Sequence, residues 1–208
     1  MTANLYLITP NKLNPMEFAP RLEEALDGGG VACVQLRLKN VSDSNIRDAC
    51  SVLRPITQSR DIAFILNDRP DLAAECRCDG VHIGQQDGTC RDARRHVGED
   101  AIVGITCHDS IHLAMIAGEQ GADYVAFGAF HTTMTKEIVH HATPDLIRQW
   151  SEIATVPCVA IGGITPDNCQ PIATAGADFI AVVSAIWNNP KGPAAAIHAF
   201  KAAIANVV

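Results

Sequence analysis

The sequence predicts a single (β/α)8 TIM barrel that spans residues 1–208. Eight short β-rich runs recur along the chain, segments with helical spacing separate them, and no Pro-, Gly- or Ser-rich linker divides the chain. The runs are almost continuously apolar, which is typical of parallel strands covered by helices. A doubly wound sheet is the alternative fold, but it usually has about five or six units and a glycine-rich turn after its first strand. Here the first run ends in ITPNKLNP, without a glycine, so the barrel is preferred.

Each expected strand is a run rich in β-branched and apolar residues. In chain order the runs are NLYLIT from residue 4, ACVQLRL from 32, IAFIL from 62, GVHI from 80, AIVGIT from 101, DYVAFG from 123, PCVAIG from 157 and DFIAVV from 178. The intervening helices have start signals at Asn14-Pro15, at Ser42 ahead of Asn45, and at Thr165-Pro166-Asp167. GADY at 121–124 and GADF at 176–179 repeat before the sixth and eighth strands. We expect these repeats to be helix-to-strand turns and not functional sites.

Composition excludes several classes of protein. Hydrophobic residues make up 48% of the chain and charged residues 19%, which favours a packed core over disorder. The net charge of −7 argues against an extended nucleic-acid surface. The longest apolar stretch, Phe179 to Trp187, is too short to cross a bilayer, and the N-terminus has no secretory signal. We therefore expect a soluble cytoplasmic protein that binds neither nucleic acid nor membrane, whose eight cysteines are reduced and without a chemical role.

The second strand is expected to carry polar residues toward its carboxyl end, and the carboxyl ends of barrel strands are where this fold places its chemistry. Gln35, Arg37 and Lys39 alternate along the chain, so a period of two places all three on one face. Two cations and an amide that converge in this way predict a site for an oligophosphate. A solvated edge strand would show the same alternation, but in a barrel this face points into the core or its mouth, where polar groups need partners.

Two aspartates follow the third and fourth runs. Asp68 comes directly after Asn67, and Asp87 ends the segment GQQD. Because neighbouring parallel strands end at the same edge, the two carboxylates could share one Mg²⁺ ion with waters and phosphate oxygens. The alternative is that each aspartate caps the helix that follows it. Spacing alone does not separate these interpretations, and the nearby cationic triplet favours the metal.

A second anion site is expected after the seventh and eighth runs. Gly162-Gly163 would let a phosphate approach backbone N–H groups at a helix start, and Ser184 would add a hydroxyl, although a plain tight turn also uses Gly-Gly. After the sixth run, a loop with three threonines and Lys136 could close over a charged ligand or be an ordinary solvated loop. His82 lies within the fourth run, and we expect it to be a satisfied barrel or interface histidine. Two anion sites in one mouth predict the condensation of two phosphorylated small molecules.

Several motifs carry a family resemblance. In order they are LYLIT, VQLRLK, FILNDRPDLA, DGVHIGQQD, VGITCH, GADYVAFGAF with TTMTK, VPCVAIGGITPDN and GADFIAVVSAI. From Leu5 to Ile186 the chain resembles the thiamine phosphate synthase and thiazole tautomerase family. The resemblance implies a barrel that joins hydroxymethylpyrimidine diphosphate to thiazole phosphate and releases diphosphate.

The resemblance also implies a set of site residues. The pyrimidine diphosphate would be bound by Gln35, Arg37, Lys39, Asn67, Thr106, Thr133, Thr135 and Lys136. Mg²⁺ would be held by Asp68 and Asp87. The thiazole phosphate would be bound by Gly163, Val183 and Ser184. Arg37, Lys39 and Lys136 would be catalytic, because they would stabilise the charge that develops on the leaving diphosphate. No enzymic nucleophile is needed, which agrees with the lack of a Ser–His or Cys–His constellation in the sequence.

The loop after the sixth run departs from the family pattern. Thr132 and Met134 stand where the family usually has prolines, so we expect a less pre-organised loop. Three rival functions remain open. A thiazole tautomerase would have a catalytic His at the position of Ala129, another sugar-phosphate enzyme would use only the site at Gly163 and Ser184, and a binding barrel would hold a thiamine precursor without turnover. A homo-oligomer is compatible with the sequence, which does not determine the assembly.

Overall fold

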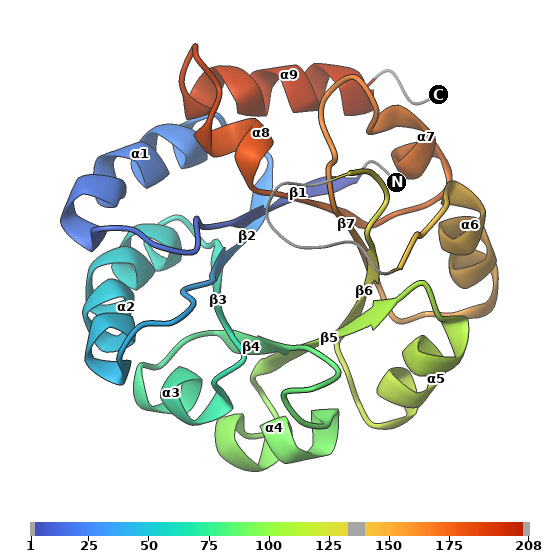
Figure 1. Cartoon of the computed structure of the whole chain (residues 1–208), viewed down its shortest axis with the longest axis horizontal. Coiled ribbons are helices and arrows are strands. Elements are labelled where there is room, and N and C mark those ends of the chain that lie inside the picture. Colours follow the sequence, from blue (N-terminus) through green and yellow to red (C-terminus); the bar gives the residue numbers. More distant parts are fainter. Residues whose placement is uncertain (1–2, 133–139, 206–208) are drawn as a thin grey trace.

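The computed structural model describes residues 3–132 and 140–205, which form one closed barrel of eight parallel strands in sequence order. Figure 1 looks down this barrel and shows the helices as an outer ring around the strands. The strands are β1 (Asn4–Ile8), β2 (Val31–Leu36), β3 (Ala63–Asn67), β4 (Gly80–Ile83), β5 (Ile102–His108), β6 (Tyr124–Gly128), β7 (Cys158–Ile161) and β8 (Phe179–Val182). The prediction of a single (β/α)8 barrel is therefore confirmed.

Helices follow the strands as the alternating pattern predicts. They are α1 (Pro15–Asp27), α2 (Asp43–Gln58), α3 (Pro70–Glu75), α4 (Cys90–Val97), α5 (Ile111–Glu119), α6 (Pro144–Ile153), α7 (Gln170–Thr174), α8 (Ser184–Trp187) and α9 (Pro193–Ala205). Two of the predicted helix starts are confirmed. The side chain of Asn14 accepts hydrogen bonds from the first turn of α1, and the hydroxyl of Ser42 accepts one from the backbone N–H of Asn45 in α2.

Two predicted boundaries are wrong. Strand β2 ends at Leu36, so Arg37 and Lys39 lie in the following loop and not on a strand face. Helix α7 begins at Gln170 and not near Pro166. The side chain of Asn168 explains this shift, because it accepts the Thr165 backbone N–H at 2.8 Å and donates to a backbone carbonyl before it, which closes a turn ahead of the helix.

Alternation along each strand divides the apolar residues between two cores. Leu5 and Leu7 of β1 belong to the large core between strands and helices. Tyr6 and Ile8 belong to a smaller cluster inside the barrel, together with residues of β2, β3, β6, β7 and β8. The smaller cluster contains two tyrosines, so the interior of this barrel combines apolar packing with polar groups.

The amino ends of three strands are held by aspartates from the turn before the next strand. Asp79 accepts the backbone N–H of Phe64 at 2.7 Å, Asp123 accepts that of Val103 at 2.7 Å, and Asp178 accepts that of Cys158 at 2.8 Å. The GADY and GADF repeats supply two of these aspartates. They lie at helix-to-strand turns as predicted, and their carboxylates tie neighbouring strands together at the end of the barrel opposite the strand carboxyl ends.

All eight cysteines are free, and six of them are buried. Burial raises the pKa of Cys107 and of Cys158 to about 12, so these thiols stay protonated at neutral pH. No helix in the described ranges is long and apolar enough to span a membrane.

Candidate functional site

A cavity of about 510 Å³ opens at the carboxyl ends of the strands. It brings together every sequence-predicted site residue that the structure describes. These residues are Gln35, Arg37, Lys39, Asn67, Asp68, Asp87, Thr106, Gly163, Val183 and Ser184. The predicted loop residues Thr133, Thr135 and Lys136 lie outside the described residues. Residues from β2, β3, β4, β5, β7 and β8 or the loops after them thus converge on one space.

One wall of the cavity carries the cations. The backbone N–H of Arg37 donates to the Thr9 hydroxyl at 3.0 Å, and its guanidinium donates to the side-chain oxygen of Asn11. Burial lowers the pKa of Arg37, although the group stays charged, and its hydrogen-bond partner Asn11 is neutral. Lys39 forms an ion pair with Asp68. A partly buried cation beside a neutral amide favours an anionic ligand.

The carboxylates of Asp68 and Asp87 lie together beside this wall. Burial, followed by the negative charge of Asp68, raises the pKa of Asp87. Neither aspartate caps a helix: the residue before α3 is Arg69, which makes no side-chain cap, and α4 is capped by Thr89. The alternative interpretation of both aspartates as helix caps is therefore wrong.

The donor set fits a hard divalent cation. The raised pKa of Asp87 beside Asp68 would be relieved by a shared positive charge, and oxygen atoms are the ligands that Mg²⁺ prefers. Among the described residues, no group of three or more His, Cys, Asp or Glu side chains could hold a metal. Mg²⁺ commonly has only one or two protein carboxylates and completes its shell with water and substrate phosphate oxygens, so a pair such as Asp68 and Asp87 fits this donor requirement.

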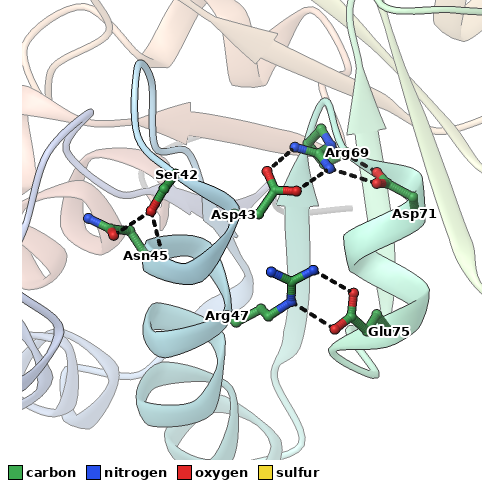
Figure 2. Close-up of polar contacts among 7 residues, drawn as sticks. All are labelled: Ser42, Asp43, Asn45, Arg47, Arg69, Asp71 and Glu75. Atoms are coloured by element: carbon green, nitrogen blue, oxygen red, sulfur yellow. Dashed lines mark hydrogen bonds and ion pairs between the residues drawn. The ribbon is translucent and has the colours of Figure 1, made fainter.

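The turn that carries Asp68 is braced from outside the barrel. Arg69 donates to both carboxylate oxygens of Asp43, at 2.5 and 3.1 Å, and to both of Asp71, at 2.9 and 2.7 Å. Figure 2 shows this guanidinium between the start of α2 and the start of α3, with the Arg47–Glu75 pair along the same two helices. Asp68 itself has a left-handed backbone with φ of 64°, which is uncommon for a residue with a side chain. The Arg69 contacts therefore hold the residue next to Asp68 in place, which stabilises a turn with an uncommon backbone conformation.

The opposite wall is formed by the ends of β7 and β8. Gly162 and Gly163 have φ of 107° and 62°, and a Cβ on either would come within 2.5 Å of the loop after β6, at Ala129 or Thr132. These glycines therefore allow the loop after β7 to pack closely against the loop after β6, which was not predicted. They also do not begin a helix, since α7, the helix that follows them, begins only at Gln170. On this wall Ser184 is the first residue of α8.

The floor of the cavity contains polar residues that the sequence did not single out as site residues. Tyr6, Tyr124 and His82 are 3%, 7% and 8% exposed, and all three line the cavity. Both ring nitrogens of His82 are hydrogen-bonded, to the Tyr124 hydroxyl at 2.9 Å and to the Thr106 hydroxyl at 2.8 Å. Burial lowers the pKa of His82 to about 4, so the ring is neutral at physiological pH. The expectation of a satisfied barrel histidine is confirmed.

Two further histidines reach the rim of the cavity. The ring of His140 stacks on that of His108, with 4.3 Å between centroids, and its Nδ1 lies 3.0 Å from a carboxylate oxygen of Asp109. Both histidines line the cavity. His108 is the last residue of β5, whereas His140 lies ahead of α6, in a segment that the sequence did not connect with the site.

A closed parallel barrel with cations, paired carboxylates and a second polar wall around one cavity defines a phosphate-handling enzyme of the (β/α)8 class. A family model described as thiamine monophosphate synthase matches residues 5–186. The chain therefore belongs to the thiamine monophosphate synthase family.

Individual relatives agree with this assignment. The chain is 62% identical over 196 residues to the thiamine-phosphate synthase of Rhodospirillum centenum, covering 94% of this chain and 95% of the relative. It is 46% identical over 205 residues to that of Erythrobacter litoralis, covering 97% and 95%. Among solved structures, thiamine phosphate pyrophosphorylase from Pyrococcus furiosus is 30% identical with a TM-score of 0.85, covering 99% of this chain and 96% of that one.

Proposed function

We propose that this protein condenses 4-amino-5-hydroxymethyl-2-methylpyrimidine diphosphate with thiazole phosphate, giving thiamine phosphate and diphosphate. One observation carries the proposal: a single cavity has cations and paired carboxylates on one wall and Gly163, Val183 and Ser184 on the other. Such a cavity suits two phosphorylated substrates held side by side. The names of the relatives support the synthase over the tautomerase, and so does Ala129, which stands where a tautomerase would have a catalytic His.

The reaction needs only positioning and charge stabilisation from the chain. The bond between the pyrimidine methylene carbon and the diphosphate oxygen breaks, and its electron pair leaves with diphosphate. Arg37 and Lys39 stabilise this charge more in the transition state than in the ground state, which accelerates departure. The thiazole nitrogen donates its lone pair to the methylene carbon and forms the new C–N bond. Ser184 and the backbone near Gly163 hold the thiazole phosphate close to that carbon.

Mg²⁺ held by Asp68 and Asp87 would neutralise diphosphate oxygens as a Lewis acid. Lys136 would add a third cation from the loop after β6. The net charge of −7 argues against nucleic acid as a partner, and we retain the expectation of a cytoplasmic protein.

The test is a phosphate-release assay coupled to inorganic pyrophosphatase. The purified protein is supplied with both precursors and Mg²⁺, and each is omitted in turn. We expect diphosphate only when all three are present, with thiamine phosphate identified by mass. Absence of product with both precursors and Mg²⁺ present, while either precursor still binds, would overturn the proposal and favour a tautomerase or a binding barrel.

A pair of variants tests the metal site separately. Asp68→Asn removes one of the two carboxylates, so we expect it to lose most of the Mg²⁺ dependence together with most of the rate. Asp48→Asn is the matched control, because Asp48 lies exposed on α2, outside the cavity lining. An unaltered Mg²⁺ titration for Asp68→Asn would show that Asp68 is not a ligand of the metal.

A further inference from the structure

A chain of four hydrogen bonds crosses the floor of the cavity and joins five strands. Gln35 Nε2 on β2 donates to the Tyr6 hydroxyl on β1 at 3.0 Å, and that hydroxyl lies 2.8 Å from the Tyr124 hydroxyl on β6. Tyr124 continues to His82 Nδ1 on β4, and His82 Nε2 continues to Thr106 Oγ1 on β5. All five side chains line the cavity. Polar groups at both ends of this chain therefore face the cavity.

The donors and acceptors can be assigned from one end. The amide nitrogen of Gln35 can only donate, so the Tyr6 oxygen accepts and the Tyr6 proton is free to go to Tyr124. The Tyr124 oxygen accepts that proton, and the Tyr124 proton then goes to Nδ1 of His82. In this arrangement each buried phenol donates once and accepts at least once, as buried hydroxyls in folded proteins do.

The assignment fixes the proton on His82. A neutral imidazole that accepts at Nδ1 carries its proton on Nε2. Nε2 must therefore donate to the Thr106 oxygen, and Thr106 keeps its own hydroxyl proton for another partner. The opposite assignment, in which Nδ1 of His82 donates to Tyr124 and Tyr124 donates to Tyr6, is less favourable. The Tyr6 oxygen would then accept hydrogen bonds from both Gln35 and Tyr124, and the Tyr6 proton would be left with the Cys33 thiol, which is a weak acceptor.

We propose that this buried chain is a positioning device: it holds His82 as the Nε2–H tautomer, so that Thr106 presents its hydroxyl proton to a hydrogen-bond acceptor of the pyrimidine substrate. The inference deepens the proposed function and rests on it for the identity of the substrate. The acceptor is a ring nitrogen or a diphosphate oxygen, both of which take a hydrogen bond from a hydroxyl. His82 acts through Thr106 and takes no proton in the reaction.

The tautomer can be measured without turnover. The whole protein is labelled with ¹⁵N-histidine, and the His82 signal is identified by its loss in His82→Asn. We expect an unprotonated Nδ1 and a protonated Nε2 at neutral pH. The opposite tautomer, or a doubly protonated ring, would overturn the proposal whether or not the protein is a synthase.

Two tyrosine variants form a matched pair, because each removes one buried hydroxyl. Tyr124→Phe disconnects His82 from the chain, and Tyr6→Phe removes the donor that sets the direction of the Tyr124 hydroxyl while leaving the Tyr124–His82 contact in place. We expect both variants to alter the His82 signal, and Tyr124→Phe to raise KM for the pyrimidine diphosphate about tenfold, with KM for thiazole phosphate unchanged. A His82 signal that is unchanged in both variants would show that the chain does not set the tautomer.

Variants of Thr106 test its donor role and locate the acceptor. Thr106→Ser keeps the hydroxyl and is expected to retain affinity, and Thr106→Val removes it at nearly constant volume. Binding is measured separately with hydroxymethylpyrimidine and with inorganic diphosphate plus Mg²⁺. Weaker binding of the first probe by Thr106→Val identifies a ring nitrogen, and weaker binding of the second identifies a diphosphate oxygen. Unchanged binding of both probes would overturn the proposal.

Discussion

The carboxylate of Asp178 accepts the backbone N–H of Cys158 at 2.8 Å, at the barrel end opposite the cavity. Cys158 is fully buried, so in Asp178→Ala this N–H has neither a protein partner nor access to bulk water. Loss of a hydrogen bond to a charged group, with a buried donor left unpaired, costs about 2 kcal/mol. For a chain of this length each kcal/mol lowers Tm by about 2–4 °C, so we expect a decrease of about 4–8 °C.

The measurement is urea and thermal unfolding of the unmodified protein and of Asp178→Ala, followed by circular dichroism, with product formation assayed at 25 °C. Asp48→Ala on the exposed face of α2 is the control and should change stability by less than about 0.5 kcal/mol. Asp178→Asn keeps an acceptor oxygen and should fall between the two. If Asp178→Ala unfolded like the control, the backbone hydrogen bond would contribute nothing measurable and the reasoning would be refuted. Turnover per folded molecule should be unchanged, because Asp178 does not line the cavity.

Three further changes have defined outcomes. A Cβ on Gly104 would lie 1.9 Å from Cζ of Tyr124. Gly104→Ala should therefore lower the free energy of unfolding by about 1–3 kcal/mol, measured by thermal unfolding. An unchanged Tm would show that the Tyr124 ring moves aside without cost. Arg69→Ala releases the turn of Asp68 and should raise the Mg²⁺ concentration for half-maximal rate severalfold. Arg47→Ala, which breaks only the Arg47–Glu75 pair, should leave that concentration unchanged. Equal Mg²⁺ titrations of the two variants would exclude bracing by Arg69. Lys136→Ala should slow turnover more than about tenfold without changing Tm, because the proposed charge-assisted contact with diphosphate would be lost. An unaltered rate would exclude this lysine from the site.

The strands of this barrel could be predicted because each is a short apolar run between turn residues. Their ends were less predictable, as β2 and α7 show. Arg37 and Lys39 continue the alternation of β2, yet the strand ends before them because the backbone turns toward Thr9 and Asn11. A strand end depends on such contacts with distant residues, and a single run of sequence does not contain them.

The site was predictable where it follows the rule that strand carboxyl ends carry function. That rule placed Gln35, Asp68 and Ser184 in one cavity. It did not find Tyr6 and Tyr124, because strands buried on both faces give no sign of which aromatic residue points inward. Their hydrogen bond joins residues 118 positions apart and exists only once the barrel has closed.

Aspartates occur at both ends of this barrel, and their partners separate structural from functional ones. Asp123 and Asp178 each lie within 2.8 Å of a strand N–H, which satisfies a backbone donor and ties two strands together. At the other end, Asp87 is partly buried with Asp68 beside it, and the raised pKa of Asp87 shows that its charge is disfavoured there. A fold gains nothing from that arrangement alone, since two neighbouring carboxylates repel each other. Under the proposed function, a cation and the diphosphate that it binds would offset this repulsion, so ligand binding would account for the aspartates at this end, as strand pairing accounts for Asp123 and Asp178.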